Sequence, residues 1–178
     1  RPGTQQVAAG YVLYSSSTIF VLTTGNGVHM FVLDTNIGAF IRVAEHLQIP
    51  DSGKIYSVNE ANFESFPGGY RKFLARCRAD GFSSRYSGAM VSDVHRILLK
   101  GGVFMYPPTA SAPSGKLRLM YECNPLGTVL SQASALAMSG LRLKTVVSPT
   151  DLHQRVPIAL GSPVNVDALV TALHDADG

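Results

Sequence analysis

The sequence has no tryptophan, only two cysteines and no apolar run long enough to cross a bilayer. Cys77 and Cys123 lie far apart, without the spacing of a metal site, so we expect two free thiols in a reducing compartment. The GxSxG, Walker, HExxH and DxxD patterns are also missing. Their absence argues against a serine-hydrolase elbow, a P-loop and a zincin site. We see no secretory signal, and we expect a cytoplasmic protein, with an organelle left open.

Charge is low and scattered along the 178 residues. There are 15 Lys and Arg against 12 Asp and Glu, which gives a net charge of +3, and 46% of the residues are hydrophobic. This composition is typical of a globular chain that buries a core. The basic residues do not cluster with aromatics, which favours a local anionic ligand over nucleic acid. The abrupt start at Arg1 leads us to expect further chain before it.

Alternating strand and helix signals predict a mixed architecture. A Gly25-Asn26-Gly27 turn joins two strands rich in β-branched and aromatic residues. Later, Asn124 is predicted to cap a helix that Gly140 ends. We predict an α/β (α+β mixed) fold, a mixed β-sheet flanked by helices, in one domain of residues 1–178. The predicted strands cover 18–24, 28–34, 38–43, 54–58, 103–106, 116–122, 144–147 and 157–160, and the other predicted helices cover 67–78, 89–100 and the segment from 162 onward.

The segment GKLRLMYECNP (115–125) carries the main candidate site. It places Glu122 at the end of a predicted strand, directly before a predicted helix start. Ligands gather at the carboxyl ends of strands, helix N-termini favour phosphate, and a carboxylate there can hold Mg²⁺. Lys116 and Arg118 share the parity of Glu122 on an ideal strand, so all three side chains are expected on one face. The alternatives are an acid that favours a helix start and a solvated edge lysine.

Four other residues, in three places along the chain, can contact phosphate or sugar hydroxyls. Arg85 and Tyr86 stand just before a helix start, with Gly88 allowing close approach of the backbone. Asn59 ends the KIYSV strand, and Tyr106 ends the strand of GGVFMYP. Each also has a plain structural interpretation as a surface, turn or packing residue. Only one well-placed acid is visible, so spacing alone predicts a phosphate half-site.

A family resemblance is carried by five strings in order. They are KIYSVNEAN (54–62), RYSGAMVSDVHR (85–96), GGVFMYP (101–107), GKLRLMYECNP (115–125) and PTDLHQRVPIALGSP (149–163), with an AAGYxLY segment at 8–14. In this order they resemble class I fructose-1,6-bisphosphatases. The resemblance covers nearly the whole chain but only the C-terminal, sugar-phosphate-binding part of the family. The family's N-terminal half, with its paired glutamates and DPLDGSS acid cluster, has no counterpart here.

The resemblance implies the sugar phosphatase, or inositol monophosphatase-like, fold and a Mg²⁺-dependent enzyme of gluconeogenesis, with Mn²⁺ as an alternative ion. The reaction would be hydrolysis of the 1-phosphate of fructose 1,6-bisphosphate to give fructose 6-phosphate, in a homotetramer. Glu122 matches a catalytic metal ligand, and Arg85 matches an arginine that reaches the neighbouring subunit's site. The other matched positions contact substrate: Asn59, Tyr86, Tyr106 and Lys116 the 6-phosphate, Ala89, Met90 and Leu117 the sugar, and Arg118 a place close to the site.

Two departures from the family bear on affinity. Asn62 stands where relatives often have a tyrosine that contacts the 6-phosphate, and Ser111 where relatives can have a lysine. Two rival functions stay open at this point. One is an enzyme resembling sedoheptulose-1,7-bisphosphatase. The other, for this fragment alone, is a non-catalytic sugar-phosphate-binding or assembly module.

Overall fold

The apolar residues of the first 44 positions form an antiparallel sheet that packs on two helices. We describe the chain from a computed structural model, which covers residues 2–139, 142–143 and 147–177. The first sheet has the order β1-β2-β3-β4, with β1 (Ala9–Tyr14), β2 (Thr18–Thr23), β3 (His29–Asp34) and β4 (Ala39–Ala44). The predicted turn joins β2 to β3, and both of its glycines have positive φ.

A second, six-stranded sheet forms the centre of the rest of the chain. Its order is β10-β9-β12-β7-β5-β6, in which β5 runs parallel to β6 and β7 and the other pairs are antiparallel. The prediction of a mixed sheet flanked by helices is therefore confirmed. The strands are β5 (Ile55–Ser57), β6 (Ser83–Ser84), β7 (Val103–Tyr106), β9 (Leu136–Ser139), β10 (Arg142–Leu143) and β12 (Ile158–Gly161), and a separate ribbon pairs β8 (Leu117–Arg118) with β11 (Arg155–Val156).

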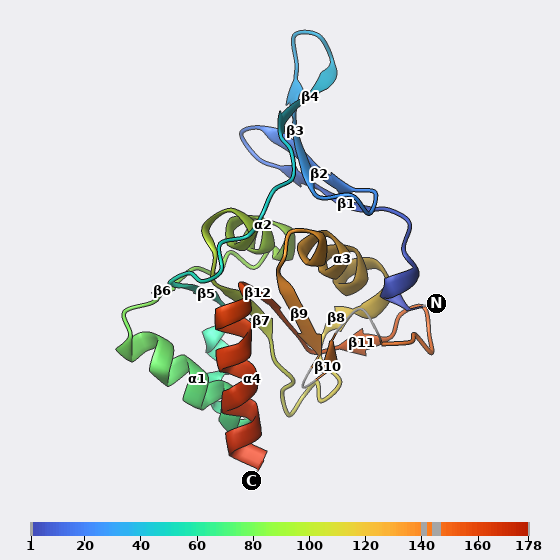
Figure 1. Cartoon of the computed structure of the whole chain (residues 1–178). Coiled ribbons are helices and arrows are strands. Elements are labelled where there is room, and N and C mark those ends of the chain that lie inside the picture. The colour runs from blue at the N-terminus through green and yellow to red at the C-terminus, as the bar shows by residue number, and fades with distance from the viewer. Residues whose placement is uncertain (1, 140–141, 144–146, 178) are drawn as a thin grey trace.

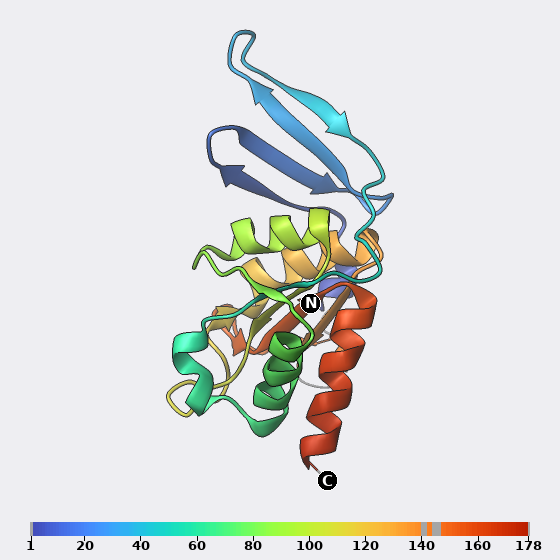
Figure 2. The same ribbon diagram turned by 90° about the vertical axis from the view of Figure 1, so that its left-hand side faces the viewer.

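Helices form two further layers, which Figure 2 shows as a stack below the first sheet. Helices α2 (Met90–Lys100) and α3 (Asn124–Gln132) lie between the two sheets, and α1 (Gly68–Ala79) and α4 (Pro163–Asp177) cover the other face of the six-stranded sheet (Figure 1). Two buried hydrophobic clusters fill the stack: one, around Val94 and Phe104, packs α2 and α3 against both sheets, and the other, around Phe73 and Met105, lies between the six-stranded sheet and α1 and α4. Among the described helices, none has the length and apolar character to cross a membrane.

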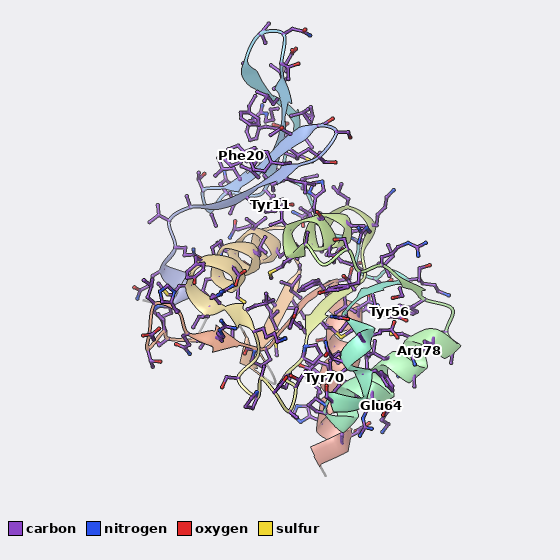
Figure 3. All side chains as sticks on the ribbon, turned by 180° about the vertical axis from the view of Figure 1, so that it is seen from behind. Tyr11, Phe20, Tyr56, Glu64, Tyr70 and Arg78 are labelled. Atoms are coloured by element: carbon purple, nitrogen blue, oxygen red, sulfur yellow. The ribbon has the colours of Figure 1, made fainter. Side chains whose placement is uncertain are left out.

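A buried polar contact joins the first sheet to α2. The Tyr11 hydroxyl lies 2.8 Å from His95 Nδ1, and the two rings meet edge to face. Burial lowers the pKa of His95 and raises that of Tyr11, so the neutral forms of both are favoured. A neutral pair can be buried without an uncompensated charge. On the opposite face of the sheet, Phe20 packs against Phe31 and Phe40 (Figure 3).

The structure corrects the predicted strand at 116–122. Strand β8 ends at Arg118, and the chain then forms a π-helical turn, Leu119–Cys123, that runs directly into α3. Leu119 and Cys123 are buried four residues apart, which is a helical spacing. Glu122 therefore lies on a helical turn and not at the end of a strand. The prediction that Glu122 shares one strand face with Lys116 and Arg118 is therefore wrong.

The helix that follows also differs from its prediction. Asn124 makes no side-chain cap, because it is buried inside a helical run that has already begun at Leu119. Helix α3 ends at Gln132, and Ser134 then takes a positive φ before the chain enters β9. Gly140 and most of the predicted strand at 144–147 lie outside the described residues. The predicted helices at 67–78, 89–100 and from 162 onward are confirmed with small shifts of their ends.

We predict that alanine destabilises the protein far more at the crowded Gly102 than at Gly81, a glycine that also has a positive φ but has open space around it. Gly102 has a φ of 118°, and an added Cβ would lie 2.2 Å from the Ile55 carbonyl oxygen. Gly81 has a φ of 73° with nothing within 4 Å of an added Cβ. We expect Gly102→Ala to lower the free energy of unfolding by about 3 kcal/mol or more, and Gly81→Ala by about 1 kcal/mol. Urea unfolding of both variants tests this, and equal losses would contradict it.

Candidate active site

A small pocket lies where β5 and β7 end, and about 290 Å³ there is free of protein atoms when the open solvent at its mouth is counted. Asn59, Tyr106 and Lys116 line it together, although they are far apart in the sequence. The parallel pairing of β5 with β7 brings Asn59 and Tyr106 to the same edge of the sheet. Lys116 joins them from the residue after Gly115, which packs closely against the backbone of Val156. The pocket thus offers an ammonium group, a phenol and a carboxamide, which can all donate to a phosphate group.

The rest of the pocket wall was largely missed from the sequence. Asn62, the position noted as a departure from the family, also lines the pocket. Pro107 and Thr109 follow Tyr106 at the end of the same strand. Because ligands gather at the carboxyl ends of strands, this position in the sequence could have indicated both residues. No comparable pattern marks the apolar wall residues Val58, Phe66 and Met105.

The turn that carries Asn59 is fixed by the acid next to it. The Asn59 side chain accepts a hydrogen bond from the Ala61 amide, which caps the 3₁₀-helix Glu60–Ser65. Glu60 forms an ion pair with Arg78 of α1 and accepts a hydrogen bond from Ser84 Oγ at 3.1 Å. Burial alone would raise the pKa of Glu60, but hydrogen bonds from Tyr56, Arg78 and Ser84 outweigh it and lower that pKa. The pocket turn is thereby tied to both α1 and β6.

The loop before α2 carries Arg85 and Tyr86. Burial, followed by the neighbouring Tyr106 and Asp93, raises the pKa of Tyr86, so its hydroxyl keeps its proton next to Tyr106, which lines the pocket. Arg85 is exposed, and its guanidinium donates only to the Ser84 carbonyl among the described residues. The structure therefore places Tyr86 beside the pocket residue Tyr106, although Tyr86 is not itself one of the residues that line the pocket, and it leaves the Arg85 side chain exposed.

Asp93 holds this loop in place. It is fully buried, and its carboxylate accepts two hydrogen bonds from the Ser87 amide, at 3.1 and 3.0 Å, and one from Arg96 Nη1 at 2.8 Å. Arg96 also donates to the Arg85 carbonyl. These contacts agree with a structural role for Asp93, since a buried carboxylate needs such partners.

The three residues expected to line the sugar have different surroundings. Ala89 is exposed at the start of α2, where its amide donates to Ser87 Oγ at 3.3 Å. Met90 and Leu117 are partly buried and pack against the hydrophobic cluster between the sheets. Their side chains contribute to the core, and their backbone groups are the polar atoms that they can offer to a ligand.

Glu122 and Arg118 form a second group beside the pocket. Glu122 Oε2 accepts a hydrogen bond from the Arg118 amide at 2.7 Å and lies 3.8 Å from Arg118 Nη1. Arg118 follows Lys116 by two residues, so the chain passes directly from the pocket to this group. Among the described residues, no group of three or more His, Cys, Asp or Glu side chains is placed to hold a metal ion. Glu122 can therefore supply one carboxylate ligand, and further ligands would have to come from elsewhere.

We expect the Glu60 ion pair to make stability depend on pH. The pKa of Glu60 is lowered in the folded protein from its ordinary value of 4.5, so its contribution is complete above that value. The contribution is lost as the pH falls through the lowered, folded-state pKa. In urea unfolding, the difference between wild type and Glu60→Gln should therefore be larger at about pH 7 than in acid.

Glu64 provides the control for this prediction. It is exposed on the same 3₁₀-helix, and it forms no ion pair in the described part of the chain (Figure 3). Glu64→Gln should change stability little at either pH. If the Glu60→Gln difference is the same at both pH values, the ion pair does not stabilise the turn.

Comparison with known proteins agrees with this geometry. Residues 49–174 match the family model of the fructose-1,6-bisphosphatase C-terminal domain, and residues 1–45 match that of the N-terminal domain. Proteins named fructose-1,6-bisphosphatase class 1 from Synechococcus elongatus and a second Synechococcus strain are 47% identical over 177 residues, which is 99% of this chain and 52% of each relative. The chain thus spans about half the length of these relatives.

A solved structure extends the likeness to three dimensions. Leishmania major fructose-1,6-bisphosphatase in its holo form matches with a TM-score of 0.94 and 41% identity, over 96% of this chain and 54% of that one. Identity at this level over almost all of the chain, together with both family models, leads to one assignment. The chain belongs to the class 1 fructose-1,6-bisphosphatase family.

Proposed function

We propose that this chain supplies the sugar and 6-phosphate site of a phosphatase that converts fructose 1,6-bisphosphate to fructose 6-phosphate in gluconeogenesis. The observation that supports the proposal most strongly is the pocket that joins Asn59, Tyr106 and Lys116. These residues match the family's 6-phosphate positions, and they come together only through the fold. The likeness to fructose-1,6-bisphosphatases over almost all of the chain supports the same substrate.

In this proposal, the pocket binds the end of the substrate that does not react. Lys116 provides a positive charge, and Tyr86 and Tyr106 provide neutral hydroxyl donors. The raised pKa of Tyr86 keeps that donor protonated. Binding energy gained at this phosphate holds the sugar in one orientation, so that the distal phosphate meets the reacting groups. The pocket is thus a positioning site.

Glu122 is proposed as the one metal ligand on this chain. Its carboxylate is a hard oxygen donor of the type that Mg²⁺ or Mn²⁺ takes, and it is only partly buried, with 30% of its side chain exposed. The Arg118 amide fixes one carboxylate oxygen by a hydrogen bond. When bound, the ion would supply charge stabilisation at the transferred phosphate and activation of water. The donor set of the described residues fits one part of such a centre and no more.

Arg85 is proposed to act in a neighbouring subunit of a homotetramer. Support comes from its place: it directly follows β6, the edge strand of the six-stranded sheet, and its guanidinium contacts only the Ser84 carbonyl among the described residues. An exposed arginine at a sheet edge is free to reach another chain.

Cytoplasmic location and a single domain of residues 1–178 stay predictions. So does the rival specificity for sedoheptulose 1,7-bisphosphate, which relative rates on the two substrates would decide.

A non-catalytic sugar-phosphate-binding module is the second candidate for this chain by itself. The observation that favours it is that Glu122 is not joined by two further metal-binding side chains in the part of the chain described here. A phosphatase of this type needs several carboxylates around its ions. The two candidates therefore share the pocket and differ only in turnover.

We predict that this chain binds fructose 6-phosphate without releasing phosphate from fructose 1,6-bisphosphate. Calorimetric titration with fructose 6-phosphate should give a saturable isotherm, and a phosphate-release assay with Mg²⁺ should give no signal. A folded chain that does not bind fructose 6-phosphate would overturn the proposed function. Steady release that a chelator stops would instead mean that this chain holds a complete metal centre.

We predict that Lys116→Ala weakens binding of fructose 6-phosphate about 10- to 100-fold, because it removes a charge-assisted hydrogen bond. Lys72→Ala is the matched control, since Lys72 lies on the exposed side of α1, paired with Asp175. The same titration should show no change for that variant. Equal losses in both variants would mean that general charge, and not the pocket, attracts the ligand.

We predict the opposite division of effects for Glu122→Gln. Fructose 6-phosphate affinity should stay within about twofold of wild type, because Glu122 contacts Arg118 and does not line the pocket. In a full-length enzyme that contains this chain, the same change should lower kcat about 100-fold or more with little change in KM. Similar kinetic defects in Lys116→Ala and Glu122→Gln would contradict separate roles for the two residues.

A further inference from the structure

A groove lies between the first sheet and α2, apart from the pocket that holds Lys116. The end of β1 and Ser15, which follows it, form one wall, and residues of α2 from Ser92 to Lys100 form the other. About 710 Å³ there is free of protein atoms when the open solvent at its mouth is counted. Small-molecule sites commonly have about 300–1,000 Å³ of space. The groove shares no lining residue with the pocket, so it is a separate place on the molecule.

His95 lines this groove and has one free ring nitrogen. The residue is only 7% exposed, and its Nδ1 lies 2.8 Å from the Tyr11 hydroxyl. Its Nε2 has no hydrogen-bond partner among the described residues. In the described part of the chain, the fully enclosed side-chain nitrogens and oxygens without a partner belong to His29, Ser57 and Asn124. His95 Nε2 is therefore not enclosed, and it opens into the groove.

The contact with Tyr11 determines which nitrogen of His95 carries the proton. Burial raises the pKa of Tyr11 and lowers that of His95, so the phenol keeps its proton and the imidazole is neutral. His95 is the one partner of the Tyr11 hydroxyl among the described residues, and a buried donor without an acceptor is costly. The phenol therefore donates to Nδ1. A neutral imidazole that accepts at Nδ1 carries its own proton on Nε2, so the groove receives an N–H donor.

The other polar side chains of the groove are also donors. Lys100 is exposed, and its ammonium forms no ion pair or hydrogen bond with any described residue. The hydroxyls of Ser15 and Ser92 likewise have no described partner. Arg96 adds a second cation, which the buried Asp93 holds at 2.8 Å. None of the described residues that line the groove is an aspartate or a glutamate, so an acceptor-rich anion meets no repulsive charge there.

Apolar surface lies beside these donors. The Leu99 side chain is 40% exposed and Tyr14 is 82% exposed, and both line the groove with Leu13. A ligand that fits the groove therefore combines an anionic group with an apolar part. A lysine in the last turn of a helix is favoured by the helix dipole without any ligand. That effect does not account for the free N–H of a buried histidine in the same groove.

We propose that this groove binds a small organic phosphate, with the phosphate at His95 Nε2 and Lys100 and the organic part on Leu99 and Tyr14. The ammonium supplies a charge-assisted hydrogen bond, and the imidazole N–H and the Ser92 hydroxyl supply neutral ones. The buried Tyr11 contact fixes the direction of the imidazole before any ligand arrives. The inference does not depend on the proposed function, since it uses none of the pocket residues.

The test follows the His95 ring by NMR while phenyl phosphate is added to the folded chain. Long-range proton–nitrogen spectra distinguish the two neutral forms of a histidine, and without ligand His95 should carry its proton on Nε2. Phenyl phosphate should move the Nε2 resonance along a saturable curve. Phenol, which has the ring but no phosphate, should leave it unmoved. Inorganic phosphate should bind at the same place more weakly, because it buries no apolar surface.

Exposed lysines provide the variants, so folding is not at risk. Lys100→Gln should weaken the binding of phenyl phosphate about fivefold or more, because it removes a charge-assisted hydrogen bond. Lys72→Gln makes the same change of charge on the exposed side of α1 and should leave the affinity unchanged. Lys116→Ala should also leave the His95 response unchanged, since Lys116 belongs to the pocket.

The remaining outcomes overturn the proposal. A proton on Nδ1 of His95 would turn an acceptor toward the groove and exclude the phosphate. An Nε2 resonance that phenyl phosphate does not move would mean that the groove is empty of this ligand. Equal losses in Lys100→Gln and Lys72→Gln would mean that general charge attracts it. A His95 response that disappears in Lys116→Ala would mean that the ligand occupies the pocket instead.

Discussion

Close backbone contacts between glycines at the start of β7 fix the position of the strands that carry the pocket. A Cβ at Gly161 would lie 2.1 Å from the Gly102 carbonyl oxygen, and one at Gly53 would lie 2.3 Å from the Gly101 carbonyl carbon. Ser162 Oγ joins them, since it accepts from the Gly102 amide and donates to the Pro50 carbonyl. Three segments far apart in the sequence thus meet with almost no space between their main chains, which allows little sliding of β5, β7 and β12 against one another.

The pocket depends on this fixed alignment. Its polar groups come from the far ends of the strands: Asn59 follows β5, and Tyr106 ends β7 opposite Ile158 of β12. A shift of one residue in a strand would move alternate side chains to the other face and remove Tyr106 from the pocket. The carboxyl groups of Glu60 and Asp93 then hold the loops that leave the strands. Each is paired with an arginine, so neither the fully buried Asp93 nor the partly buried Glu60 is left as an uncompensated charge.

Sequence patterns predicted much of this, and their failures have a physical cause. Helices α1 and α2 and strand β7 were predicted closely because each has one dominant period and a clear stop, such as Gly101. Residues 116–122 satisfy two periods at once, since Leu117 and Leu119 alternate while Leu119 and Cys123 have helical spacing. Only the packing of Leu119 and Cys123 into the core decides between them. Cross-strand neighbours such as Arg118 and Arg155 depend on register, which one sequence does not reveal.

The helical turn at Leu119–Cys123 gives Glu122 a position that a strand would not. On a continued strand its side chain would lie more than about 12 Å from Arg118, four residues along an extended chain. The turn instead brings the carboxylate back to accept a hydrogen bond from the Arg118 amide. The carboxylate of Glu122 is thereby held by the backbone of Arg118, whose guanidinium also lies close to it. Any movement of β8 therefore carries Arg118 and Glu122 together. In the proposed site, the metal ligand Glu122 and the pocket residue Lys116 are therefore positioned by one short segment.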